Sequence, residues 1–165
     1  MSDKITIPLP TEITCKIDEW LLKFPIPYNK QAAIIPALTI VQKYNNGWLT
    51  ENLLDAVAAY LSIPRVKVYE VANFYNSFDL KPIGKYKIGI CTNLSCMLCG
   101  CKKITEYITN KLNINFGETT KDFKFTLKSL ECLSACDKAP VMLINDQHFE
   151  NLTIEMVDEI LSGLI

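Results

Sequence analysis

The sequence lacks a surplus of either charge, a long apolar run and more than one histidine. Its 165 residues carry 17 Lys and Arg against 18 Asp and Glu, giving a net charge of −1. This balance argues against a nucleic-acid-binding protein, whose affinity rests on an excess of basic side chains. No apolar run is long enough to span a bilayer, so direct membrane insertion is not expected. The single histidine, His148, excludes a Rieske-type site, which needs two, and we expect it at the surface in a turn.

Targeting signals and nucleotide-binding motifs are also missing. The N-terminal stretch MSDKITIPLP holds no apolar signal segment and no Arg-rich amphipathic stretch. We therefore expect a cytoplasmic bacterial protein, or one from which a transit peptide has been removed. No G-x-G-x-x-G follows a predicted strand and no P-loop is present, so this chain is not expected to bind a nucleotide itself.

Cysteine, by contrast, is abundant, with seven in the chain. Without a secretion signal, a reducing compartment favours metal binding or redox chemistry over structural disulfides. Cys15 stands apart from the others in TEITCKIDEWL, and we expect it to be a buried small apolar residue. With 49% apolar residues, the chain can form one ordinary domain or two small ones.

The first part of the chain, residues 11–78, has the apolar spacing of helices. Thr50 is a plausible N-cap for the helix in LTENLLDAVAAYL. Pro64 suits the first position of the next helix, and an earlier helix is expected to start or kink near Pro36.

The second part changes to mixed periodicity, with a boundary near Leu80. Alternating or apolar runs predict strands at 85–91, 123–128 and 141–144, and residues 145–146 form a turn candidate. Amphipathic spacing predicts helices at 100–112 and 153–165. The sequence therefore predicts an α+β protein, with a helical domain over residues 1–80 and an α/β domain over residues 81–165.

Two cysteine pairs each follow a predicted strand. Cys91 ends the first strand and Cys96 lies after it, and Cys132 and Cys136 follow the second strand. If these strands are neighbours, their loops meet at one end of the sheet and supply four thiolates. Four thiolates are the ligand set that iron–sulfur clusters need.

Other uses of the cysteines remain open. Cys91, Cys96 and Cys99 have the spacing of a plant-type ferredoxin, with one distant cysteine as the fourth ligand. A four-thiolate zinc site is a second alternative, although structural zinc favours two-residue spacings in both pairs. A third is a thiol oxidoreductase that uses Cys96 and Cys99 as a dithiol. In the four-ligand interpretation, Cys99 and Cys101 pack as ordinary residues near a helix start.

Several segments together resemble the small thioredoxin-like 2Fe–2S subunit of respiratory complex I, also called NADH:quinone oxidoreductase. They are GWLTENLLDAVAAYLSIPRVKVYEVANFY, ICTNLSCMLCG, GETTKDFKFTLKSLECLSACDKAPVMLIN and FENLT. The similarity runs from about residue 30 to the end of the chain. Related subunits serve NAD-reducing hydrogenases and NAD-dependent formate dehydrogenases, which are the alternative parent complexes.

The resemblance implies an N-terminal helical bundle followed by a thioredoxin-like domain. It implies one 2Fe–2S cluster, bound by Cys91, Cys96, Cys132 and Cys136, that exchanges single electrons with FMN in an adjacent subunit. FMN and NAD(H) are expected on that partner, and the large iron–sulfur subunit of the complex is expected as a second partner. This chain would carry no catalytic residue of its own. In a bacterium it would be peripheral on the cytoplasmic face of the inner membrane, and otherwise in the mitochondrial matrix.

Three positions depart from the family's pattern. Many relatives have Arg where this chain has Cys99, and Gly where it has Ser134 or Phe123. Cys99 places an extra thiol near the expected cluster, where it could compete as a ligand. Ser134 occupies a position where Gly would give the backbone freedom near a sulfur.

Secondary candidates surround the cysteines and the helical part. Backbone N–H groups of residues 92–95, namely Thr92, Asn93, Leu94 and Ser95, could donate to the sulfurs, and Asp137 and Lys138 flank the second pair. Trp48, Phe74 and Tyr75 are candidates for contact with a partner subunit, because aromatic residues are enriched in interfaces, and internal packing is the alternative for each.

Overall fold

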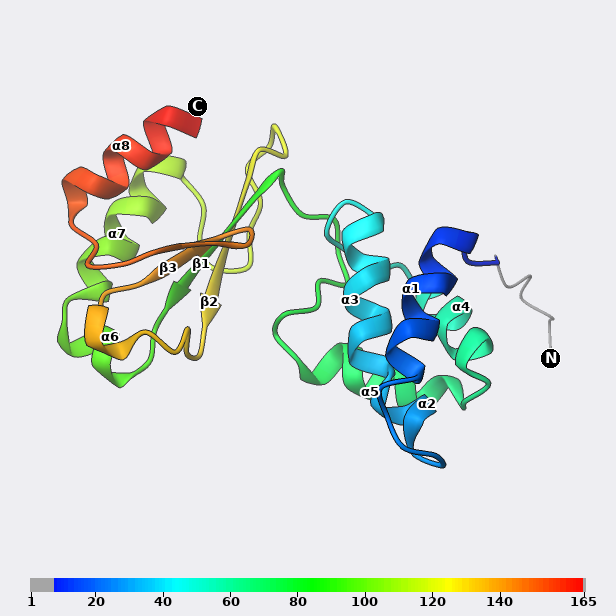
Figure 1. Cartoon of the computed structure of the whole chain (residues 1–165). Helices are drawn as coiled ribbons and strands as arrows, with labels where there is room; N and C mark the ends of the chain where they lie inside the picture. Colours follow the sequence, from blue (N-terminus) through cyan, green and yellow to red (C-terminus); the bar gives the residue numbers. More distant parts are fainter. Residues whose placement is uncertain (1–7, 165) are drawn as a thin grey trace. The chain divides into compact units, whose positions relative to one another are not determined.

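The computed structural model describes residues 8–164, which divide into two compact units that part between Pro82 and Ile83. Figure 1 shows helices alone in the first unit and strands with helices in the second. This confirms the predicted α+β class. The absence of a signal segment was predicted largely from residues 1–7, which lie outside the described range.

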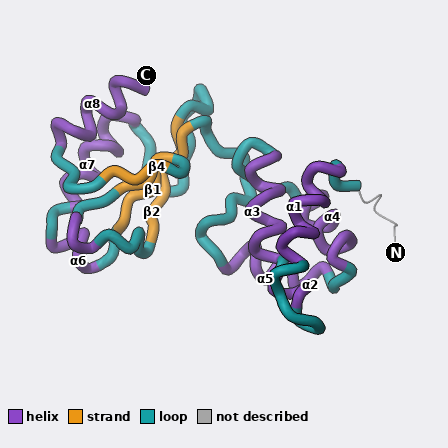
Figure 2. The backbone as a smooth tube through the Cα atoms, in the orientation of Figure 1, coloured by secondary structure: helices purple, strands orange, loops and turns teal. Residues whose placement is uncertain are grey.

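The first unit packs its helices through apolar stripes. Ile13 and Ile17, four residues apart, are buried on one face of α1, and Leu38 and Val41 are buried on α3. These residues share one core with the buried faces of α4 and α5. Figure 2 shows the helical segments that contain them. The helices are α1 (Thr11–Leu21), α2 (Asn29–Ala32), α3 (Ile34–Tyr44), α4 (Glu51–Leu61) and α5 (Arg65–Phe74).

The starts of these helices follow the sequence signals closely. The Thr50 side chain accepts a hydrogen bond from the N–H of Leu53 at 3.2 Å, which confirms it as the N-cap of α4. Pro64 lies one residue before the predicted place, as the N-cap of α5, because its ψ of 135° is not helical. Pro36 lies in the first turn of α3, where its missing N–H breaks no helical hydrogen bond.

The second unit contains a mixed sheet of order β2-β1-β3-β4. Strands β1 and β2 are parallel, and β3 is antiparallel to both β1 and β4. The elements in chain order are β1 (Tyr86–Cys91), α6 (Leu94–Leu98), α7 (Cys101–Leu112), β2 (Phe125–Leu130), a 3₁₀ turn η1 (Cys136–Lys138), β3 (Met142–Ile144), β4 (Gln147–Phe149) and α8 (Ile154–Leu164).

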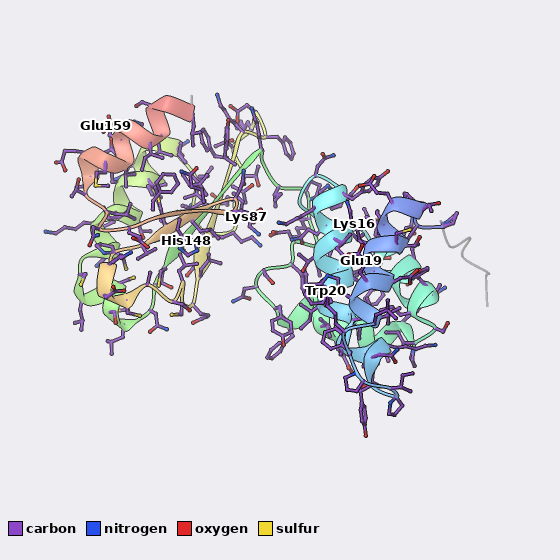
Figure 3. All side chains as sticks on the ribbon, in the orientation of Figure 1. Lys16, Glu19, Trp20, Lys87, His148 and Glu159 are labelled. Atoms are coloured by element: carbon purple, nitrogen blue, oxygen red, sulfur yellow. The ribbon has the colours of Figure 1, made fainter. Side chains whose placement is uncertain are left out.

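One face of this sheet forms the core of the second unit. Ile88 and Ile90 of β1 are fully buried, together with Ile108 of α7 and Leu161 of α8. Both helices therefore cover the same face, as Figure 1 shows. In Figure 3, the labelled side chain of His148 lies on the other side of the sheet from α8.

The strands differ from the sequence prediction in detail. The second strand begins at Phe125 rather than residue 123, because Phe123 closes a turn with a φ of 54°. The turn at residues 145–146 is present and leads into β4, which was not predicted. His148 is therefore in a strand and not in a turn, although it is exposed as expected. Strand β4 has only three residues, too few for a period of two to be visible in the sequence.

Candidate metal centre

The two cysteine-bearing loops meet at one edge of the sheet. Strands β1 and β2 run parallel with Cys91 opposite Leu130, so the loops that follow them leave the sheet side by side. The Cys91 thiol contacts the carbonyl oxygen of Glu131, 3.8 Å from its sulfur. The prediction that adjacent strands bring the loops together is confirmed.

The first cysteine loop, residues 91–101, directs three of its four thiols inward. Asn93 caps α6 by accepting the N–H of Leu94 at 2.7 Å, and α6 carries Cys96 into the interior. Gly100, with a φ of 90°, makes the turn into α7. As a result Cys91, Cys96 and Cys101 pack together with Val141, and we call these three cysteines the buried thiol cluster.

Burial controls the acidity of this cluster. Removal from water raises the pKa of Cys96 to about 11, and its hydrogen bond with Cys91 acts in the same direction. Burial is also the main cause that raises the pKa of Cys101, and the nearby Cys91 raises it further. The Cys96 thiol is therefore protonated at neutral pH without metal, so a metal ion that binds it must displace its proton.

The second cysteine loop, residues 131–138, has the opposite arrangement. Cys132 and Cys136 are exposed, whereas Leu133 and Ala135 pack against the buried thiol cluster. Ser134 has a φ of 56°, the left-handed conformation that Gly adopts without cost. Its N–H donates to the Cys132 sulfur over 3.4 Å.

The four thiols of the two cysteine loops are chemically suited to bind an iron–sulfur cluster. Four thiols come from two loops at one edge of the sheet, and one sulfur already accepts a backbone N–H. Among residues 8–164, no group of three or more His, Cys, Asp or Glu side chains is yet arranged to hold a metal ion. Cys132 and Cys136 would therefore have to turn inward for all four to bind one cluster.

The structure also shows where the backbone N–H groups proposed to donate to the sulfurs are engaged. The N–H of Thr92 bonds to the carbonyl of Leu130, and that of Leu94 bonds to its own helix cap, so both are engaged elsewhere. Two backbone donors that are present, the N–H of Ser134 to the Cys132 sulfur and that of Val141 to Cys96, were not among those named from the sequence. The sequence feature that pointed to Ser134 was its presence in place of an expected Gly, at a position where the backbone has a positive φ. Lys138 forms an ion pair with Glu150 at 2.8 Å, and this hydrogen bond raises the pKa of Lys138.

The remaining cysteines have separate surroundings. Cys99 is exposed at the C-cap of α6, whereas Cys96 is buried. A reactive dithiol needs a thiol with a lowered pKa, and that of Cys96 is raised, so the geometry argues against a thiol oxidoreductase. Cys15 is exposed, and the prediction of burial was wrong. Ile13 and Ile17 occupy the inward face of α1, and a residue midway between them points to the opposite side.

The aromatic candidates in the first unit differ in exposure. Phe74 is 77% exposed and Tyr75 is 42% exposed, with their ring centroids 5.0 Å apart. Trp48 is half-buried. Phe74 and Tyr75 therefore remain candidates for contact with a partner. Of the helices within residues 8–164, none has both the length and the apolar character to cross a membrane.

Comparison with known proteins gives consistent relatives. A family profile described as thioredoxin-like [2Fe-2S] ferredoxin matches residues 17–165. The E subunit of NADH-quinone oxidoreductase from Rickettsia conorii is 43% identical over 147 residues, covering 89% of this chain and 87% of the relative. The mitochondrial NADH dehydrogenase [ubiquinone] flavoprotein 2 of Dictyostelium discoideum is 42% identical, covering 88% of this chain and 60% of the relative.

A solved structure shares the fold. A chain of NAD⁺-reducing [NiFe]-hydrogenase in its H₂-reduced state matches with a TM-score of 0.67 and 21% identity. The match covers 78% of this chain but only 22% of that much longer one. At this identity the similarity concerns the fold alone.

Proposed function

The chain belongs to the thioredoxin-like [2Fe-2S] ferredoxin family, and we propose that it is the electron-transfer subunit of an NADH-quinone oxidoreductase. Family membership implies an iron–sulfur cluster. We propose one 2Fe–2S cluster on this chain, bound by Cys91, Cys96, Cys132 and Cys136. The chain acts as a subunit and does not contain a complete active site.

The parallel pairing of β1 with β2 carries this proposal. It places two cysteine pairs from distant parts of the sequence at one edge of the sheet. A dithiol of Cys96 and Cys99 needs no such pairing of two strand ends, and the spacings within the two pairs do not suit structural zinc. Cys91 and Cys96 are already side by side, as the effect of Cys91 on the pKa of Cys96 indicates.

The residues of the chain have distinct roles in this scheme. When bound, the cluster accepts and returns electrons one at a time. Cys91 and Cys96 would hold iron through their sulfurs as thiolates, and their burial keeps water from the inner side of the site. Cys132 and Cys136, which are exposed, would have to turn inward to hold the same cluster. The N–H of Ser134, which already bonds to a ligand sulfur, stabilises negative charge there and tunes the reduction potential.

The partners follow from the same relatives. We propose that this chain binds a subunit that carries FMN and NAD(H), and that the large iron–sulfur subunit belongs to the same complex. Exposed Phe74 and Tyr75 are candidate anchors for such a contact. In a bacterium the complex would hold the chain at the cytoplasmic face of the inner membrane, and in a mitochondrion on the matrix side.

A role in an NAD-reducing hydrogenase or an NAD-dependent formate dehydrogenase is the second candidate. The hydrogenase chain is 21% identical, whereas the corresponding NADH-quinone oxidoreductase chain of Rickettsia prowazekii is 45% identical over 139 residues. The relatives at higher identity favour the quinone-reducing complex.

An anaerobic reductive titration tests the proposed function. We expect the purified chain to take up about one electron, with loss of visible colour and appearance of a paramagnetic signal. Cys136→Ala should abolish the colour and the signal, because it removes one of four ligands. Cys15→Ala is the matched control and should leave both intact, because Cys15 is exposed on α1. A colourless wild-type chain, or a Cys136→Ala variant that titrates like the wild type, would contradict the assignment.

A further inference from the structure

The buried thiol cluster contains a cysteine that the proposed ligand set does not use. Cys101 is only 4% exposed, although it is the first residue of α7. Its buried neighbours are Cys91, Cys96 and Val141, which form a small core separate from the rest of the unit. A third thiol therefore lies inside the site, beside two ligands.

The local fold explains why Cys101 is directed inward. Helix α6 ends at Leu98, and Gly100 takes a left-handed φ of 90° before α7 begins. This turn brings the start of α7 back over Cys96. The mutual effects on acidity agree with close sulfurs. Burial is the main cause that raises the pKa of Cys101, and Cys91 is the second cause. Both Cys91 and Cys101 also raise the pKa of Cys96.

Cys99 provides the contrast within the same loop. It lies two positions before Cys101, at the C-cap of α6, and its side chain is exposed. It is not part of the buried thiol cluster. Proximity in sequence therefore does not decide which extra thiol can reach the metal.

We propose that Cys101 is a reserve ligand, which binds iron through its sulfur when Cys91 or Cys96 is lost. The inference rests on the proposed function, because it requires an iron–sulfur cluster at this site. The substitution exchanges one thiolate for another, and the Cys101 thiol releases its proton to solvent as the iron–sulfur bond forms. No electron is transferred in this step. The iron keeps four sulfur neighbours, so the cluster persists with an altered environment.

Alanine variants of the full chain test this proposal, since alanine offers no ligand atom. Iron and acid-labile sulfide are measured after anaerobic purification, together with visible and electron paramagnetic resonance spectra. The single variants are Cys91→Ala and Cys96→Ala. Each is also combined with Cys101→Ala, and separately with Cys99→Ala as the matched control. Far-UV circular dichroism identifies which single variants remain folded, and having two of them keeps the test decisive if one does not.

We expect a folded single variant to retain about two irons and two sulfides, with shifted spectra. Adding Cys101→Ala should lower the iron content at least about tenfold, whereas adding Cys99→Ala should not. Cys132→Ala should lose its iron despite Cys101, because Cys132 lies outside the buried thiol cluster. Folded single variants that lack iron, or double variants with Cys101→Ala that retain it, would overturn the proposal. A wild-type chain without iron would overturn the proposed function as well, which separates the two failures.

Discussion

Ser134 shows how one residue can connect backbone strain to the chemistry of the site. Its left-handed conformation directs its N–H toward the sulfur of Cys132. A residue with a side chain holds that conformation at a cost of about 1 kcal/mol, and glycine does not. A glycine at this position, as the family resemblance leads us to expect, would adopt this conformation without that cost.

Ser134→Gly should raise the free energy of unfolding by up to about 1 kcal/mol, because the relief of strain exceeds the extra freedom of the unfolded chain. The N–H to the Cys132 sulfur would be kept. Ser95→Gly is the matched control, since Ser95 lies in the right-handed helix α6, where the same change should destabilise by about 0.5–1 kcal/mol. Thermal melting of the anaerobic protein measures both. A loss of stability in Ser134→Gly would contradict the strain argument.

Individual cysteines were predicted unevenly from the sequence. Cys15 was expected to be buried because an isolated cysteine often is, but the position of Ile13 and Ile17 on α1 determines its exposure. Cys101 was expected to pack as an ordinary helix residue, and it does pack in the interior. That its neighbours are Cys91 and Cys96 depends on the turn at Gly100, which no spacing rule describes.

At the scale of elements, helix α4 depends on its N-cap residue, Thr50. The Thr50 side chain satisfies the N–H of Leu53, and the backbone of Thr50 is extended, with a ψ of 158°. Thr50→Ala should lower the free energy of unfolding by about 1 kcal/mol through loss of this cap. Thr39→Ala, on the exposed side of α3, is the control and should be nearly neutral, because the Thr39 hydroxyl only bonds to a carbonyl already engaged in its own helix. Equal effects in chemical denaturation would contradict a specific role for the cap.

The long elements could be predicted because their periodicity is repeated several times. The helix at Cys101–Leu112 and the strand at Tyr86–Cys91 lie within one residue of the limits expected from sequence. Strand β4 was missed because its three residues pair only with β3, at the edge of the sheet. The start of β2 was placed too early because the positive φ at Phe123, where relatives often have Gly, is not a property of its residue type.

At the scale of the whole molecule, the site is a product of topology rather than of one motif. The stretch at residues 91–101 contains enough thiols to suggest three different sites. The parallel pairing of β1 with β2 adds the second cysteine loop to the same edge, which favours a metal site with four thiolates over a dithiol of Cys96 and Cys99. The sequence could predict this meeting from strand order. It could not predict that Cys91 and Cys96 are buried while Cys132 and Cys136 are exposed, since this difference arises from how each loop packs on Val141.

The presence of a cluster on this chain is decided by the iron, acid-labile sulfide and zinc content of the anaerobically purified full chain. We expect about two irons and two sulfides per chain with negligible zinc, the composition of one four-thiolate 2Fe–2S centre. One zinc per chain, or a folded chain with reduced thiols and no metal, would contradict it. In that case the fold of the family would be present in this chain without the cluster.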